Sequence, residues 1–243
     1  MFKLFKQKKF SLYKPALVIL FLIIFILPLG AETSEDNFRW SVSGSLLYFA
    51  ANNGADSDPA PILPSLGFSF SWKFWGPLRI ELTEDLYFTN YQYNSVHGYP
   101  MACNQAERSA FVFGFLTGVQ LKWIIDLEKK DISIRVYGGP AADFRIITLA
   151  FGLKHPSDFE GGIETNVKLQ TDAIFNYFWG KGRWLMPVLG AGMDFPVSEN
   201  FLIGFDLRVW FPVYKIWAND NTPAIDGWRF GAGLRITPRK NSQ

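Results

Sequence analysis

Three features of this sequence predict an all-β fold, a transmembrane antiparallel up-and-down β-barrel. Apolar and polar residues alternate with a period of two along most of the chain, which is typical of strands with one apolar and one polar face. Apolar residues make up 49% of the 243 residues, although only one apolar run, Ala16–Leu29, approaches the length of a spanning helix. Short and long connections also alternate along the chain, as they do in membrane barrels.

The composition excludes two other classes of protein. Charged residues make up 19% of the chain and aromatic residues 17%, and the net charge is only +2. The chain is too apolar for a disordered protein, and too weakly charged for a nucleic-acid partner. Because Ala16–Leu29 has 14 residues, it is shorter than the ~20 that a transmembrane helix needs.

Residues 1–31 predict a cleaved signal peptide. Five lysines precede the apolar run, and Gly30-Ala31 supplies small residues before an acidic stretch, which is the layout of a secretory signal. Cleavage after Ala31 leaves a barrel domain, residues 32–243, with 19 basic and 22 acidic residues and a net charge of −3. The alternative is an uncleaved signal anchor. The single cysteine, Cys103, excludes an intrachain disulfide.

Eight segments carry the alternation. In Phe38–Ala50 and Ser65–Trp75 the even-numbered residues are mostly large and apolar, and the odd-numbered ones are mostly small or polar. Leu78–Thr89 repeats the pattern, except that Glu84 interrupts the apolar side. The other expected strands are Ala110–Ile125, Ile132–Ile146, Trp184–Phe195, Phe201–Val213 and Trp228–Ile236. The weakest of them is Trp184–Phe195, because it is apolar on both faces.

The connections distinguish the two ends of the expected barrel. The short connections are Gly76-Pro77, Asp126–Asp131 and Pro196–Asn200, and the long polar ones are Ala51–Pro64, Asn90–Ser109, Thr148–Arg183 and Tyr214–Gly227. Aromatic residues concentrate near the strand ends, where they would form interfacial girdles. A soluble β-sandwich or lipocalin-like barrel is the alternative, but it would have to accommodate charged faces on nearly every strand.

The expected number of strands is eight, with ten as the alternative. A ninth segment, Val167–Trp179, also alternates, and bacterial barrels have even strand numbers. The segment therefore either belongs to a long structured outer loop within residues 148–183 or pairs with Ile147–Leu153 to make ten strands.

Two stretches resemble small outer-membrane barrels of the OmpW-like and OmpA-like families. Ile134–Phe144 reads IRVYGGPAADF and Met186–Val209 reads MPVLGAGMDFPVSENFLIGFDLRV. The second is similar to the descending strand, periplasmic turn and ascending strand of those families. The resemblance implies a bacterial outer-membrane location, with membrane lipid and the barrel-assembly machinery as partners, and in some members a hydrophobic channel for small apolar molecules. The chain departs from the families after Ile236, where a polar tail replaces the terminal aromatic residue.

The polar faces of the strands predict what fills the lumen. The interior of an eight-stranded barrel is just wide enough for side chains to fill, and an unpaired buried charge costs several kcal/mol. Charged residues there should therefore pair across the lumen. The expected charge network contains Arg79, Glu81, Asp85, Arg135, Asp206, Arg208 and Arg235. It forms either a plug or a narrow gated ion path.

Five residues of inward parity predict an apolar upper lumen, the half nearest the long connections. These residues are Phe49, Tyr87, Trp184, Met186 and Trp210. They either pack on one another or line a pocket for a small apolar ligand.

The sequence does not predict an enzyme. The two histidines, His97 and His155, lie in long connections without a clear partner to form a nucleophile or base, and we expect no metal or cofactor. We therefore expect an outer-membrane barrel, narrow or plugged, with a role in the passage of small apolar solutes or in membrane integrity. The alternative is a surface adhesin or recognition protein that acts through its long extracellular loops.

Overall fold

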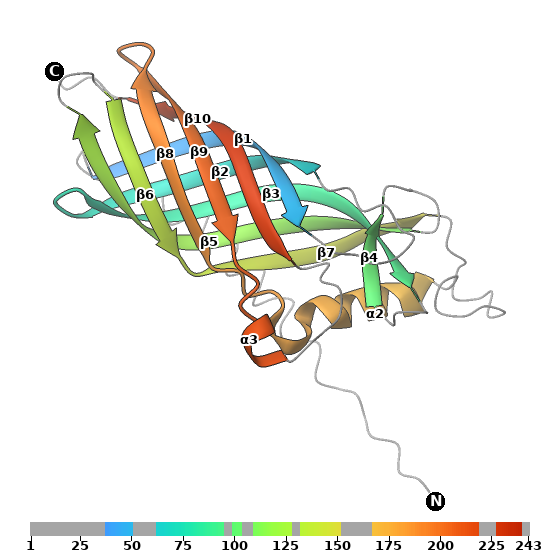
Figure 1. Cartoon of the computed structure of the whole chain (residues 1–243). Helices are drawn as coiled ribbons and strands as arrows, with labels where there is room; N and C mark the ends of the chain where they lie inside the picture. Colours follow the sequence, from blue (N-terminus) through green and yellow to red (C-terminus); the bar gives the residue numbers. More distant parts are fainter. Residues whose placement is uncertain are drawn as a thin grey trace, which may run out of the picture. The chain divides into compact units, whose positions relative to one another are not determined.

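The computed structural model describes residues 37–50, 62–94, 99–103, 109–127, 132–151, 167–218 and 227–239. The chain divides into two units, Met1–Asn37 and Phe38–Gln243, and the second is a β-barrel (Figure 1). The predicted signal peptide, residues 1–31, lies outside the described residues and stays a prediction.

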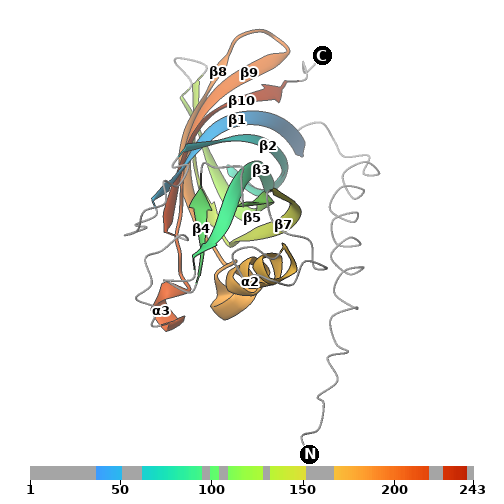
Figure 2. The same ribbon diagram turned by 90° about the vertical axis from the view of Figure 1, so that its right-hand side faces the viewer.

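Eight strands close the barrel in the described part of the chain. They are β1 (Phe38–Ala50), β2 (Ile62–Trp75), β3 (Leu78–Asn94), β5 (Ser109–Leu127), β6 (Ile132–Gly139) continued by β7 (Ala141–Phe151), β8 (Val188–Pro196), β9 (Phe201–Trp210) and β10 (Trp228–Pro238). Neighbours around the ring are β3-β2-β1-β10-β9-β8-β6-β5, and pairing of β3 with β5 completes it. Figure 2 shows these strands curving around a common axis. The prediction of an eight-stranded antiparallel barrel is confirmed.

The expected strand Ile132–Ile146 is interrupted at Pro140. β6 pairs with Leu121–Leu127 of β5, and β7 pairs with Ser109–Gly118 of the same strand. Proline has no backbone N–H to give to a ladder, but its carbonyl accepts a hydrogen bond from the N–H of Val119 at 3.0 Å. β6 and β7 therefore form one broken strand of the barrel wall.

The segment Val167–Trp179 is a helix, so the alternative that paired it as a strand with Ile147–Leu153 to make ten strands is wrong. It forms α2 (Val167–Trp179), followed by the 3-10 turn η2 (Gly180–Gly182). Ile174 and Phe178 are its buried side chains, and a spacing of four residues places them on one face of a helix. The segment belongs to the outer region of the barrel, as the other interpretation expected.

Two smaller elements complete the outer end. β4 (Tyr99–Cys103) pairs with the far end of β3, and α3 (Lys215–Ala218) follows β9. No helix in the described ranges combines the length and the apolar character needed to cross a membrane.

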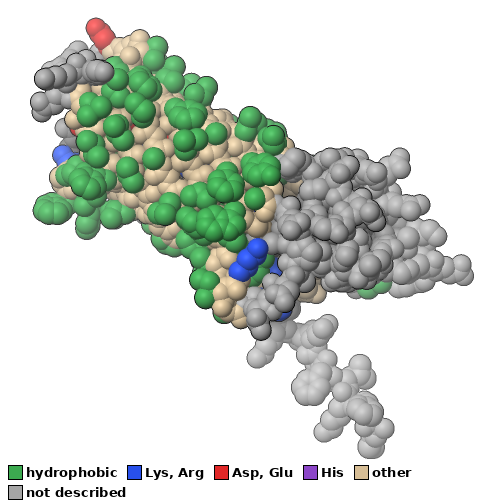
Figure 3. Space-filling model, in the orientation of Figure 1, with side chains coloured by type: hydrophobic (Ala, Val, Ile, Leu, Met, Phe, Trp, Pro, Cys, Tyr) green, Lys and Arg blue, Asp and Glu red, His purple; other side chains and the backbone are tan. Residues whose placement is uncertain are grey.

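Side chains alternate between the lumen and the outer surface. Along β10 the odd-numbered residues from Arg229 to Thr237 are buried, whereas the even-numbered ones from Trp228 to Ile236 are exposed. Leu234, for example, is 62% exposed. Figure 3 shows apolar side chains spread over the wall of the barrel. An apolar outer face around a polar interior is the arrangement of a barrel that spans a membrane.

Aromatic rings lie at both ends of the wall. At the outer end the ring of Trp228 is 4.9 Å from that of Phe211 and 6.5 Å from that of Phe230, which lies 6.4 Å from Tyr48. At the opposite end Trp75, beside the short turn, is 75% exposed. These are the positions of the interfacial girdles that the sequence predicted.

Glu84 is the exception on the lipid-facing side. It lies on β3 between Leu82 and Leu86, and its Oε2 accepts a hydrogen bond of 2.6 Å from the hydroxyl of Thr117 on β5. Its Oε1 is buried without a hydrogen-bond partner among the described residues. Ionisable groups at this depth are costly because no water solvates them, and the hydrogen bond from Thr117 offsets only part of that cost.

We expect Glu84→Leu to raise the free energy of unfolding by on the order of 1 kcal/mol, because acidic residues on the lipid face are destabilising. The matched control is Leu86→Glu, which places a carboxyl on the same face of β3 opposite Phe115 and should lower stability. Urea unfolding in lipid vesicles, followed by heat-modifiable gel migration, measures both changes. A Glu84→Leu barrel less stable than the wild type would contradict the expectation.

Candidate functional site

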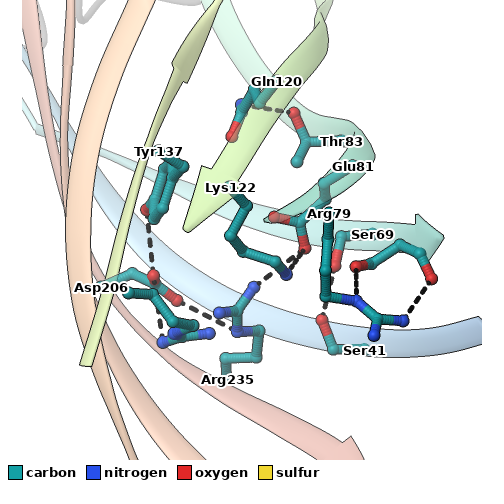
Figure 4. Close-up of polar contacts among 12 residues, drawn as sticks. Ser41, Ser69, Arg79, Glu81, Thr83, Gln120, Lys122, Tyr137, Asp206 and Arg235 are labelled. Atoms are coloured by element: carbon teal, nitrogen blue, oxygen red, sulfur yellow. Dashed lines mark hydrogen bonds and ion pairs between the residues drawn. The ribbon is translucent and has the colours of Figure 1, made fainter. Parts of the chain in front are cut away.

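A row of alternating charges crosses the lower lumen, the half nearest the short turns. This ion chain consists of Lys122, Glu81, Arg235, Asp206, Arg135 and Asp194. Lys122 Nζ lies 2.7 Å and Arg235 Nη1 lies 3.2 Å from the same oxygen, Oε1 of Glu81. On its other side Arg235 Nε lies 3.3 Å from Asp206 Oδ2. Figure 4 shows Lys122, Glu81, Arg235 and Asp206 converging from different strands.

The ion chain continues through Arg135 to the opposite wall. Arg135 Nη2 lies 3.3 Å from Asp206 Oδ1, and Arg135 Nε lies 3.1 Å from Asp194 Oδ2. The hydroxyl of Tyr137 donates a hydrogen bond of 2.9 Å to Asp206 Oδ1. Because the six members come from β5, β3, β10, β9, β6 and β8, the ion chain joins six strands, and its three positive and three negative charges balance.

Arg208 and Asp85 form a separate pair in the middle of the lumen. The guanidinium contacts both carboxylate oxygens, and Nη2 lies 2.9 Å from Oδ1. Nη2 also donates a hydrogen bond of 2.8 Å to the hydroxyl of Ser45. This two-pronged geometry is the strong form of an arginine–carboxylate pair, and it ties β9 to β3 and β1.

Asp143 is the centre of a third cluster, in the upper lumen. Its Oδ2 lies 2.5 Å from Arg145 Nη2 and 2.6 Å from Arg229 Nη2. The hydroxyl of Tyr87 donates a hydrogen bond of 2.8 Å to its Oδ1, and Arg145 Nε donates one of 3.0 Å to the same hydroxyl oxygen. The guanidinium of Arg229 also lies over the ring of Phe49, 4.4 Å from its centre.

Apolar side chains fill the rest of the upper lumen. The buried cluster there contains Leu47, Phe49, Leu63, Tyr87, Leu116, Ala141, Met186, Val188 and Trp210. The rings of Phe49 and Tyr87 meet edge to face, with their centres 5.3 Å apart. Four of the five residues predicted for the upper lumen therefore lie in one packed cluster. The fifth, Trp184, lies outside it and is half-buried.

Hydroxyl side chains line the remaining side of the lower lumen. The hydroxyl oxygens of Ser41 and Ser69 lie 2.6 Å apart. Arg79 Nε donates a hydrogen bond of 2.7 Å to the hydroxyl of Ser71. A cavity of about 20 Å³ lies between Ser41 and Ser69 on one side and members of the ion chain on the other, which is room for roughly one water molecule.

Two glycines make space for two tyrosine rings of the lumen. A Cβ added to Gly114 would overlap the ring of Tyr87, and one added to Gly190 would overlap the ring of Tyr137. In each pair the ring lies flat against the glycine backbone of a neighbouring strand. The aromatic side chains can fill the lumen only because these positions lack a side chain.

All seven residues predicted for the charge network are buried in the lumen. Four of them, Glu81, Arg135, Asp206 and Arg235, belong to the ion chain. Asp85 and Arg208 form the central pair, and Arg79 contacts Ser71. Lys122, which shares their inward parity, is also buried there, but the expected network did not include Asp143, Arg145, Asp194 and Arg229. All four have the inward parity of their strands. Asp194 was harder to recognise, because its strand is apolar on both faces.

The lumen carboxylates form ion pairs with basic side chains. Glu81, Asp85, Asp143, Asp194 and Asp206 each lie within ion-pair distance of an arginine or lysine. Among the described side chains, no group of three or more His, Cys, Asp or Glu residues is placed to hold a metal ion. The arrangement is that of a polar interior whose carboxylates are paired with basic side chains of the same lumen.

No protein-family model and no curated protein matches the sequence. Solved structures do resemble the barrel. Neisserial surface protein A has 10% identity and a TM-score of 0.47, with 84% of this chain and 97% of that chain covered. The outer-membrane protein OprG of Pseudomonas aeruginosa has 10% identity and a TM-score of 0.48, with coverages of 84% and 96%. The attachment invasion locus protein Ail of Yersinia pestis has 8% identity and a TM-score of 0.42, with coverages of 83% and 96%. All three resemble this chain in fold only.

We expect Asp143→Asn to lower the free energy of unfolding by about 3–5 kcal/mol, because it removes the carboxylate between two buried guanidinium groups. The control is Asp126→Asn, at an exposed residue that accepts a hydrogen bond from Ser133 and should change stability by less than about 1 kcal/mol. Urea unfolding in vesicles measures both. Equal effects of the two substitutions would show that the Asp143 cluster does not stabilise the barrel.

Gly114→Ala should destabilise the barrel by about 1–3 kcal/mol, the usual range for overpacking. The Tyr87 ring cannot yield easily, because its hydroxyl is bonded to Asp143. Gly44→Ala is the matched control, since a Cβ at that lipid-facing glycine meets nothing within 4 Å. Thermal unfolding monitored by gel migration compares the two. A smaller loss for Gly114→Ala than for Gly44→Ala would contradict the packing described.

Proposed function

We propose that this chain is a bacterial outer-membrane barrel with a sealed lumen and that its role is to maintain membrane integrity. The observation that carries the proposal is the filling of the lumen at three levels, by the ion chain, by the Arg208–Asp85 pair and by the upper apolar cluster. The apolar wall and the aromatic rings at its two ends support a position across the membrane. In this proposal outer-membrane lipid contacts the wall, and the barrel-assembly machinery inserts it.

The packing of the lumen favours membrane integrity over the passage of small apolar solutes. A pocket for a small ligand has a volume of roughly 300 Å³ or more, whereas the cavity beside the ion chain has about 20 Å³. Four of the five residues predicted for an apolar pocket lie in one packed cluster instead, where the rings of Phe49 and Tyr87 meet. Neither histidine lies in the described residues, and no catalytic role forms part of the proposal.

We expect the wild-type protein in planar lipid bilayers to show no steady conductance. The double variant Asp85→Ser/Arg208→Ser removes both partners of the central pair without leaving an unpaired charge. Because it empties one of the three filled levels, it should show more frequent transient openings than the wild type. The control is Asp172→Ser/Lys181→Ser, which removes one exposed acid and one exposed base outside the lumen. Heat-modifiable gel migration checks that each variant folds. Steady wild-type conductance equal to that of the lumen variant would overturn the sealed-lumen proposal.

A second candidate function is surface recognition through the outer end. One observation favours it: the outer region is built from ordered elements that are anchored to the barrel. The ring of Trp179 on α2 lies 5.8 Å from that of Phe144 on β7, and the ring of Phe178 lies 3.7 Å from the guanidinium carbon of Arg145. A barrel with the connection Asn90–Ser109 shortened to a turn should fold, and cells producing it should lose attachment to an epithelial monolayer. Unchanged attachment would reject this candidate.

A further inference from the structure

The outer end of the barrel exposes an apolar surface that a sealed lumen does not explain. Ile216 is 82% exposed and Trp217 is 54% exposed, and both lie on α3. Large apolar side chains that are exposed next to one another indicate an interaction surface.

This surface is continuous with the outer aromatic girdle. Phe211 packs edge to face against Trp228, whose ring is 4.9 Å away on the lipid-facing side of β10. Ile216 follows Phe211 by five residues in the chain. Side chains that combine an aromatic ring with a polar group, as Trp217 does, are enriched at the boundary between acyl chains and head groups. The chain therefore enters α3 directly from the level of the membrane interface.

Side-chain contacts hold α3 in place. The indole Nε1 of Trp217 donates a hydrogen bond of 2.9 Å to the carbonyl oxygen of Lys181 in η2. Arg183 lies over the rings of Tyr177 and Tyr214, 4.0 Å and 5.5 Å from their centres, and Tyr214 is buried. The orientation of α3 is thus set by contacts with η2 and with the end of α2.

Two exposed lysines flank the apolar surface. The hydrogen bond from Trp217 brings Lys181 next to α3, and Lys215 is the first residue of that helix. In Figure 3 basic side chains lie beside apolar ones where the described wall ends. Residues 177–185 and 211–218 contain no acidic residue, and the next acids along the chain, Asp220 and Asp226, lie outside the described residues. Lysines beside an apolar interfacial surface can extend to lipid phosphate groups.

We propose that α3 and η2 form a lipid-docking surface that binds the phosphate groups of anionic lipids in the outer interface of the membrane. Ile216 and Trp217 enter the boundary between head groups and acyl chains, while Lys181 and Lys215 contact phosphate oxygens as point charges. The proposal rests on the membrane-spanning barrel of the proposed function, but not on its sealed lumen.

The first test measures the depth of Ile216 in the membrane. In a Cys103→Ser background, a fluorophore is attached to the cysteine of the Ile216→Cys variant. The full chain is reconstituted in phosphatidylcholine vesicles that contain head-group spin-labelled lipid, which quenches a fluorophore close to the head groups. The matched control is Asn176→Cys, at an exposed residue of α2 on the side opposite the buried Ile174 and Phe178. We expect quenching of the fluorophore to be several-fold stronger at position 216 than at position 176. Equal quenching at both positions would overturn the proposal.

The second test measures lipid preference. Quenching of the probe at 216 is compared between spin-labelled phosphatidylglycerol and spin-labelled phosphatidylcholine at the same mole fraction. The wild type should prefer phosphatidylglycerol several-fold, because each lysine near the surface attracts anionic lipid. Lys181→Gln/Lys215→Gln should abolish this preference, whereas Lys73→Gln, at an exposed lysine of the short-turn end, should leave it unchanged.

Three further outcomes would contradict the proposal. They are a wild type without lipid preference, a preference that survives in the double lysine variant, and a probe shielded from both lipids that crosslinks to a second copy of the chain. The last outcome would assign the surface to self-association. Loss of lipid preference in a barrel that stays non-conducting overturns the docking surface alone. Conductance with an intact lipid preference overturns the sealed lumen alone.

Discussion

The charges that the strands turn into the lumen must be paired there, mostly with groups on other strands, and the rest of the structure depends on this constraint. A charge left unpaired in so narrow an interior costs several kcal/mol. The ion chain meets the constraint by joining six strands through contacts of 2.7–3.3 Å. A slip of one residue in any pairing would turn that strand's charges toward lipid and its apolar residues into the lumen. The ion chain and the apolar wall therefore select the same register.

The same constraint explains the distribution of small residues. Space for the arginines and aromatic rings comes from glycines and serines on neighbouring strands. Gly190 accommodates Tyr137, and Gly114 accommodates Tyr87. Where large side chains leave a gap, the hydroxyls of Ser41 and Ser69 contact each other at 2.6 Å. A lumen filled in this way stabilises the barrel and obstructs passage, so the contacts that hold the wall in register also support the proposed role in membrane integrity.

The arrangement of the outer end depends on the interruption of the β6–β7 strand at Pro140. Above Pro140, β7 joins the segment that precedes β8 through the bridge between Ala142 and Leu185. An open strand edge is not tolerated in the hydrocarbon region of a membrane. α2 packs against this part of the wall, with Phe178 over Arg145 on the inner side and Trp179 beside Phe144 on the outer side. The helix is thus anchored to the broken strand of the wall while it forms part of the outer surface.

The sequence by itself determined the eight wall strands, their two faces and the inward position of the seven charges of the expected network, because a period of two is a local property of the chain. It did not determine the conformation of Val167–Trp179. The alternating residues there are odd-numbered, but the buried ones, Ile174 and Phe178, are even-numbered and four residues apart, which is a helical spacing. It also could not assign partners. Asp85 and Arg208 are separated by 123 residues, and Trp184 falls outside the cluster that Trp210 joins. Such contacts depend on the register of eight strands at once, so only the closed tertiary structure decides them.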